Sequence, residues 1–241
     1  MSKQHSFSTL LSSFCGMLLL VLLLAGCGGD NTSTPSAQQL IKDAQTALPQ
    51  VTSYHFNLTA QNIGPNSALP IQNADGDLVV PNKLKANATV FLSGVSLQTQ
   101  LIAIDSDEYV YVLTSWQKTS ETLDPRKLTP GLVALLGQLQ NPSTPADSSS
   151  DNTSCWSING KLDATYLAAF TGGGAPAGTM DDVTVCIGKS DKLPYLLTIK
   201  GSAAQGDTAQ TTRTIKFSKF NEQVTITAPP TTSFPAVTPT P

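Results

Sequence analysis

The spacing of apolar residues changes early in the chain from a helical period to a strand period. Leu40, Ile41, Ala44 and Leu48 fall along one stripe of a helix that Ser36 can cap. Pro49 follows this stripe and is a helix-ending signal. The pattern therefore predicts one amphipathic helix over 36–48, ahead of all strands.

From residue 54 onward, apolar and polar residues alternate with a period of two, which is typical of strands with one buried face. Short turns such as Ser93-Gly94 separate neighbouring stretches, which favours antiparallel pairing. The expected strands are 54–60, 77–80, 86–93, 95–104, 109–113, 154–162, 179–188, 195–201, 211–220 and 223–228.

Two helical segments interrupt the strands. Thr129 and Pro130 supply an N-cap and first-turn signal ahead of the leucine-rich segment 131–139, and Asp163 caps the segment 164–170. Because segment 131–139 is apolar nearly all round, it is either buried or lines a cavity, and the sequence leaves both readings open. Strands with separate helices predict an α+β fold built on a mostly antiparallel sheet.

A further apolar run, residues 14–25, is too short to cross a bilayer as a helix, which takes about 20 residues, and it leads into Gly26-Cys27. This pattern is typical of a signal peptide over 1–26 and resembles a bacterial lipobox. We expect cleavage before Cys27, lipidation of Cys27, and anchoring of the mature chain on the extracytoplasmic face of the cell membrane. An uncleaved signal anchor is the alternative.

Composition divides the mature chain into three parts. Residues 27–35 are small, polar and glycine-rich, which suits a flexible tether, and residues 229–241 are rich in proline, which suits a disordered tail. Residues 36–228 have about the length of one domain. The chain carries 14 Lys and Arg against 17 Asp and Glu, without a basic patch, so nucleic-acid binding is not expected.

Two cysteines remain once the signal peptide and Cys27 are set aside. Cys155 and Cys186 form an even pair in an oxidising compartment, which favours a disulfide between them. Two buried free thiols are the alternative. A metal site is not expected, because two ligands without companion histidines cannot complete a tetrahedral shell.

Residues able to do catalytic chemistry are scarce. His55 is the one histidine of the mature chain and falls on the polar face of a predicted strand, which favours a surface role. Gly188-Lys189-Ser190 lacks the upstream glycine of a phosphate-binding loop, and Asp75-Gly76-Asp77 lacks the further carboxylates of a calcium loop and is predicted to be a turn. We expect no enzyme activity and no cofactor.

Several short segments, in order behind the lipobox, resemble the LppX and LprA/LprF/LprG lipoproteins. The resembling segments are 53–58, 74–78, 85–91, 116–118, 123–125, 193–194 and 220–226, within about residues 36–230. The resemblance implies a curved antiparallel half-barrel, similar to periplasmic lipoprotein carriers, with helices on its concave face. It also implies an apolar cavity between sheet and helices that takes acyl chains. Cys155, Cys186 and the proline-rich tail are not part of the family pattern.

The leading hypothesis is therefore a non-enzymatic lipoprotein that binds or transfers lipids or lipoglycans through this cavity. Its expected partners are an acylated lipid or glycolipid as ligand, the membrane through the anchor, and a membrane transporter as a candidate. Strand alternation and helix position predict the lining residues Phe56, Leu58, Val90, Leu92, Leu97, Leu101, Leu132, Leu135, Leu136, Leu139, Leu167 and Phe170.

Two other readings stay open. Each lining residue can instead belong to an ordinary core, and the protein is then a solid-cored envelope module that binds a protein partner. A hydrolase of envelope lipids is the third reading, and it requires His55 or a pair of carboxylates to face the cavity.

Overall fold

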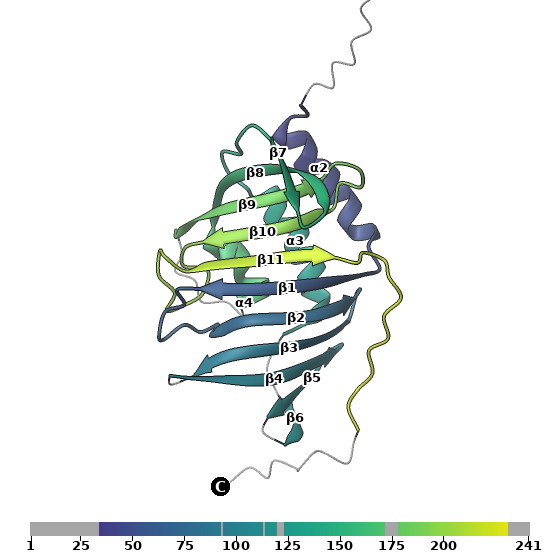
Figure 1. Cartoon of the computed structure of the whole chain (residues 1–241), viewed down its shortest axis with the longest axis vertical. Helices are drawn as coiled ribbons and strands as arrows, with labels where there is room; N and C mark the ends of the chain where they lie inside the picture. Colours follow the sequence, from purple (N-terminus) through teal and green to yellow (C-terminus); the bar gives the residue numbers. More distant parts are fainter. Residues whose placement is uncertain (1–33, 93, 113, 120–122, 172–177, 231–241) are drawn as a thin grey trace, which may run out of the picture. The chain divides into compact units, whose positions relative to one another are not determined.

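The strands form one sheet of 11 members, paired in the order β6-β5-β4-β3-β2-β1-β11-β10-β9-β8-β7 (Figure 1). The computed structural model describes residues 34–92, 94–112, 114–119, 123–171 and 178–230. The strands are β1 Ser53–Gln61, β2 Ile71–Val79, β3 Lys83–Leu92, β4 Val95–Ile104, β5 Asp107–Val112, β6 Ser115–Thr119, β7 Ala146–Ser150, β8 Thr153–Asp163, β9 Met180–Gly188, β10 Pro194–Lys200 and β11 Thr212–Ser218. Every pair is antiparallel, and the β1–β11 pair joins two meanders.

The helices lie on one face of this sheet, behind it in the view of Figure 1. They are α2 Ala37–Ala47, η1 Leu48–Gln50, η2 Pro125–Lys127, α3 Leu128–Gly137, η3 Ala164–Leu167 and α4 Ala168–Thr171. We call the face that carries them the inner face and the opposite one the outer face. None of the described helices is long and apolar enough to span a membrane.

The register of the strands explains why one face is apolar and the other polar. One row of paired residues crosses the inner face: Ile158, Val185, Leu197, Ile215, Leu58, Ala74, Ala88 and Thr99. The adjacent row, one residue along each strand, crosses the outer face: Asn159, Thr184, Thr198, Thr214, Thr59, Asn73, Thr89 and Gln98. Period-two alternation therefore decides which side chains meet the helices.

One hydrophobic cluster joins the sheet to the helices, and it includes Leu40 of α2, Leu135 of α3, Leu78 of β2 and Leu197 of β10. The sheet, the described helices and this core all lie in the unit that begins at Pro35. The predicted signal peptide, Cys27, the tether up to residue 33 and the tail after residue 230 lie outside the described residues.

Local helix signals were confirmed at two of three sites. The hydroxyl of Ser36 accepts a hydrogen bond from Gln39 N (3.2 Å), and the carboxylate of Asp163 accepts one from Thr165 N (2.9 Å). The prediction that Thr129 caps the leucine helix was wrong. Helical structure begins earlier, at η2, where Asp124 caps Arg126 N, and the chain passes directly from η2 into α3.

Four strand-level predictions were also wrong. β6 and β7 were missed because edge strands need no apolar alternation, and Ala146-Asp147-Ser148-Ser149-Ser150 has none. Asp75-Gly76-Asp77 is not a turn but lies within β2. The predicted strand 223–228 does not join the sheet.

The segment after β11 cannot pair with β11 itself, because β11 already has β1 and β10 on its two sides. Lys219 and Asn221 adopt left-handed backbone angles (φ 51° and 62°), which turn the chain away from β11. Asn221 then ties this turn to the start of β1, since its Oδ1 accepts a hydrogen bond from Thr52 N (2.8 Å) and its N donates to Ser53 O (2.8 Å). The segment continues past the ends of the strands (Figure 1).

The predicted disulfide between Cys155 and Cys186 is present. It joins the neighbouring strands β8 and β9 with a Cα–Cα distance of 5.5 Å, and both residues are buried. Both lie on the outer face, so the bond cross-links the sheet without entering the contact between sheet and helices.

Candidate functional site

The inner face carries the predicted lining residues, and those of the helical segments are the most deeply buried. Leu132, Leu135 and Leu136 of α3 are fully buried, as is Leu167 of η3. Leu139, just after α3, is also buried, whereas Phe170 of α4 is partly buried against the same cluster. The helical part of the prediction therefore forms one packed group under the sheet.

Two glycines show how closely this group is packed. A Cβ on Gly160 of β8 would lie 2.6 Å from Leu139 Cγ, so Leu139 occupies the space that a side chain would take. A Cβ on Gly137 would lie 2.5 Å from Nε2 of Gln45, whose side chain reaches over from α2 and donates to Val133 O (3.1 Å). The absence of a side chain at Gly137 therefore leaves room for the Gln45 side chain of the neighbouring helix.

The lining residues predicted on strands follow a gradient of exposure. Phe56, Leu58 and Leu101 are partly buried against the hydrophobic cluster. Val90 is half-buried, and its cross-strand partner Leu97 is 44% exposed. For Leu92 only the backbone pairing with Val95 is described. Exposure thus rises along β3 and β4 toward the turn that joins them.

We call Phe56, Leu58, Val90, Leu97, Leu101 and Phe170 the apolar strip. It begins beside the buried leucines of α3 and ends at Leu97, which is 44% exposed, near the β3–β4 turn. In Figure 1 the labelled helices lie behind the upper and middle strands, and β3 to β6 extend beyond them. The labelled helices therefore cover the inner face over the upper and middle strands, and beyond them the short helix η2 packs against β3.

Glu108 lies at one side of this face, opposite Ala103 on β4. Its side chain accepts hydrogen bonds from Thr119 Oγ1 (3.1 Å) and from Leu123 N (3.0 Å). These contacts attach β6 and the segment leading into η2 to β5. Glu108 is therefore used to position chain segments next to the apolar strip.

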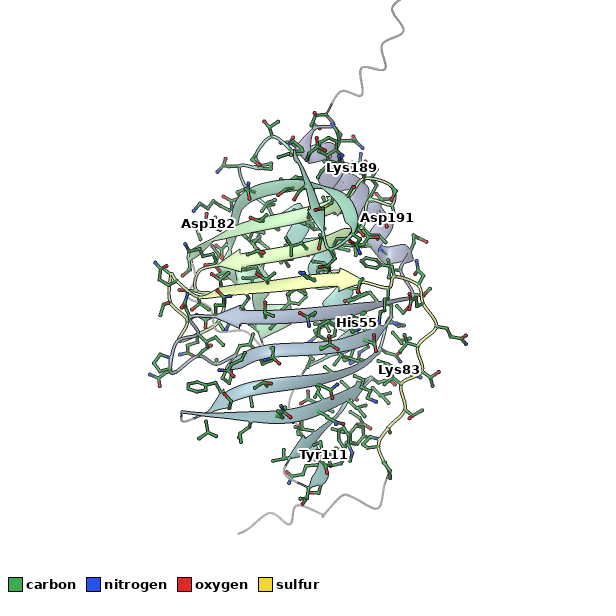
Figure 2. The ribbon with its side chains drawn as sticks, viewed as in Figure 1. His55, Lys83, Tyr111, Asp182, Lys189 and Asp191 are labelled. Atoms are coloured by element: carbon green, nitrogen blue, oxygen red, sulfur yellow. A yellow bond between two sulfur atoms is a disulfide. The ribbon has the colours of Figure 1, made fainter. Side chains whose placement is uncertain are left out.

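His55 lies on the outer face, away from the strip (Figure 2). Its Nδ1 is 2.8 Å from Asp77 Oδ1 and its Nε2 is 3.2 Å from Asp75 Oδ2. This arrangement does not place the histidine at the apolar face, as the hydrolase reading requires. Among the described residues no group of three or more His, Cys, Asp or Glu is placed to hold a metal ion.

The outer face also bears a surface hollow of about 350 Å³ across β8 to β11. Six of its eight lining residues have polar side chains; the lining residues are Asn159, Gly160, Asp182, Val183, Thr184, Thr198, Lys200 and Thr212. Thr184 donates to Asn159 Oδ1 (2.6 Å) and Lys161 pairs with Asp182 (2.6 Å), so several of these groups already satisfy one another. None of the predicted lining residues contributes to this hollow.

Residues 36–226 match the LppX_LprAFG lipoprotein family. The chain belongs to this family. Members of the LppX_LprAFG family are lipoproteins and not enzymes, as the sequence predicted. The match covers the sheet and the described helices, so the fold and the family assignment rest on the same part of the chain.

Individual members of the family are similar at low identity. LprA of Mycobacterium bovis is 26% identical over 252 residues, covering 94% of this chain and 99% of LprA. The lipoarabinomannan carrier protein LprG of Mycobacterium leprae is 30% identical over 155 residues, covering 59% of this chain and 64% of LprG.

Two solved structures share the fold. LprF of Mycobacterium bovis superposes with a TM-score of 0.66 at 23% identity, over 82% of this chain and 99% of LprF. LppX of Mycobacterium tuberculosis gives a TM-score of 0.60 at 19% identity, over 79% of this chain and 98% of LppX. These likenesses confirm the predicted α+β architecture of an antiparallel sheet with helices on one face.

Proposed function

We propose that this protein is an extracytoplasmic lipoprotein, anchored in the cell membrane through lipid on Cys27, that binds or transfers acylated lipids or glycolipids. The observation that carries the proposal is the apolar strip, which continues from the buried leucines of α3 to the exposed side chain of Leu97 near the β3–β4 turn. A contiguous, exposed apolar surface of this kind often marks a site that binds a ligand, a membrane or another protein.

Burial of acyl chains supplies the driving force in this proposal. Removing apolar surface from water gains about 25 cal/mol per Å², and an acyl chain laid along the strip would cover both its own surface and that of the protein. The acyl chain would extend toward the predicted lining residues of the helical segments, which are Leu132, Leu135, Leu136, Leu139 and Leu167. The relative LprG, named a lipoarabinomannan carrier protein, supports an amphiphile with a glycan headgroup as the ligand class.

The test uses the unacylated chain from Gly28 onward and titration with a fluorescent fatty acid. We expect Leu101→Ser, at the centre of the strip, to weaken probe binding at least about tenfold, equal to ~1.4 kcal/mol. Leu97→Ser should act in the same direction, and because Leu97 is already 44% exposed the variant should fold normally.

A matched control lies on the other face of the same sheet. Leu196 of β10 is half-buried, as Leu101 is, but it pairs with Cys186 and Lys216 on the outer face. Leu196→Ser should leave probe affinity unchanged. Absence of probe uptake and of co-purified lipid by native mass spectrometry in the wild type would instead support the solid-cored module.

A further inference from the structure

The exposed large hydrophobic residues of the described chain gather at one end of the sheet. They are Phe91, Val95, Leu97, Val112, Tyr166 and Met180. Phe91 and Val95 flank the β3–β4 turn, and Val112 ends β5 just before the β5–β6 turn. Met180 pairs with Asp163, at the point where β8 ends and β9 begins, so it belongs to the same end. In Figure 1 the β3–β4 turn lies at the left of the sheet, and β5 and β6 lie at its bottom.

The same end is free of charge across β3 to β6. Residues 86–104 and 109–117 contain no Lys, Arg, Asp or Glu. The charged residues that border these stretches are Lys85, Asp105, Glu108 and Lys118, and all of them lie toward the opposite end of the strands. Ionised side chains are costly to bring into a bilayer, whereas apolar ones are favoured there. The end of β3 to β6 that carries the exposed apolar residues therefore has no charged side chain that would oppose contact with a bilayer.

An aromatic pair lies beside the exposed residues. Tyr111 of β5 and Trp116 of β6 are cross-strand neighbours, and their ring centroids are 5.4 Å apart in an edge-to-face arrangement. Both rings are half-buried (Tyr111 is labelled in Figure 2). Trp and Tyr are enriched where apolar surface meets lipid headgroups, because each combines an apolar ring with a polar group.

We propose that the described ends of the β3–β4 and β5–β6 hairpins, residues 90–92, 94–97, 110–112 and 114–117, dock onto a lipid bilayer. We call this the hairpin surface. Val95, Leu97 and Val112 enter the apolar layer, and Tyr111 and Trp116 lie at the headgroups. Since Leu97 also belongs to the apolar strip, docking opens the strip toward the bilayer, a role in loading that rests on the proposed function. The docking proposal does not depend on the proposed function, because it rests on the exposed apolar side chains, the absence of charged residues and the position of the aromatic pair.

The test measures co-sedimentation of the unacylated chain from Gly28 onward with vesicles of neutral phosphatidylcholine, at low and high salt. We expect binding that persists at high salt, because apolar insertion is not screened by ions. Val95→Asp and Val112→Asp should each reduce the vesicle-bound fraction at least about fivefold, since each places a charge in the apolar layer. Ser149→Asp, with the same added charge on the exposed strand β7, is the matched control and should bind as the wild type does.

Probe titration on the same variants separates this proposal from the carrier function. Val95 and Val112 are not part of the apolar strip, so their variants should keep wild-type affinity for the dispersed fatty acid, which also shows that they fold. Loss of vesicle binding with retained probe affinity supports docking. Vesicle binding without any probe uptake keeps docking and removes the carrier function. Unchanged vesicle binding in both variants, or an equal effect of Ser149→Asp, overturns the proposal. It is also overturned if the wild type does not bind vesicles and instead forms a dimer that Val95→Asp dissociates.

Discussion

At the scale of single residues, buried charges hold together loops that are distant in sequence. Arg213 and Asp207 form an ion pair with side chains that are 4% and 0% exposed. Arg213 Nη2 also donates to Leu69 O (3.0 Å), and Ser67 Oγ donates to Asp207 Oδ1 (2.7 Å). These bonds join the connection after β1 to the connection after β10. No sequence pattern marked these residues, because the burial of a charge depends on partners that only the fold supplies.

Asp181 of β9 leads to a prediction about pH. Burial raises the pKa of Asp181 to about 6, and although Oδ1 accepts a hydrogen bond from Ser202 N (2.8 Å), Oδ2 has no partner among the described residues. The pKa in the folded protein thus lies above the value of 3.8 expected when unfolded. The stability that the raised pKa of Asp181 contributes to the folded protein is complete below about pH 4 and is lost as the pH rises through about 6.

We therefore expect Asp181→Asn to be stabilised relative to the wild type as the pH rises from about 5 to about 7.5. The difference in the free energy of unfolding should grow by about 1 kcal/mol over this range. Urea unfolding at several pH values measures it. Parallel pH profiles for the two proteins would show that Asp181 keeps an ordinary pKa.

At the scale of elements, close approach decides which glycines are required. In β8, a Cβ on Gly160 would meet Leu139 Cγ at 2.6 Å and the backbone oxygen of Gln140 at 2.9 Å, so the neighbouring backbone would have to move. In α3, a Cβ on Gly137 would meet the amide end of Gln45, a flexible side chain that can turn away. A side chain at Gly160 would therefore have to displace backbone, whereas one at Gly137 would have to displace only the end of a flexible side chain.

Gly160→Ala should lower the free energy of unfolding by about 1 to 3 kcal/mol through overpacking. Gly137→Ala should stay within about 1 kcal/mol of the wild type, because the gain in helix propensity offsets the lost contact of Gln45. Chemical denaturation of the two variants gives the comparison. An equal loss in both would mean that the α2–α3 contact is as rigid as the contact between Leu139 and β8.

At the scale of the whole domain, covalent and hydrogen-bonded links determine how the two meanders hold together. The pairing of β1 with β11 joins residues from the two ends of the domain into the middle of the sheet. The disulfide closes a loop of 31 residues between β8 and β9, near the opposite edge from β6. The bond therefore restrains the unfolded chain in the second meander and not across the central pair.

Replacing both cysteines with alanine should lower the free energy of unfolding by about 2 to 5 kcal/mol while the fold is retained. Chemical denaturation measures the loss, and reduction of the wild type with dithiothreitol should cause a similar one. A variant as stable as the oxidised wild type would mean that the pairing of β8 with β9 already restrains the unfolded chain.

The sequence alone determined the features that depend on neighbours along the chain. Alternation predicted most strands and the face that each residue occupies, because successive side chains of a strand point to opposite faces. Ser36 and Asp163 were identified as caps, because a cap and the amide it binds are two or three residues apart. The two cysteines left after the lipobox indicated their own pairing, and ordered short segments indicated the family.

The tertiary structure alone decided the features that depend on partners from elsewhere in the chain. The sequence predicted Leu97 and Leu136 alike as lining residues, but Leu97 is exposed at the end of the sheet and Leu136 is fully buried beneath it. Residues 223–228 have a strand pattern, yet β11 already pairs on both sides, so they cannot pair with the strand that precedes them. Exposure and strand order are set by contacts summed over the folded chain, and a local pattern contains no record of those contacts.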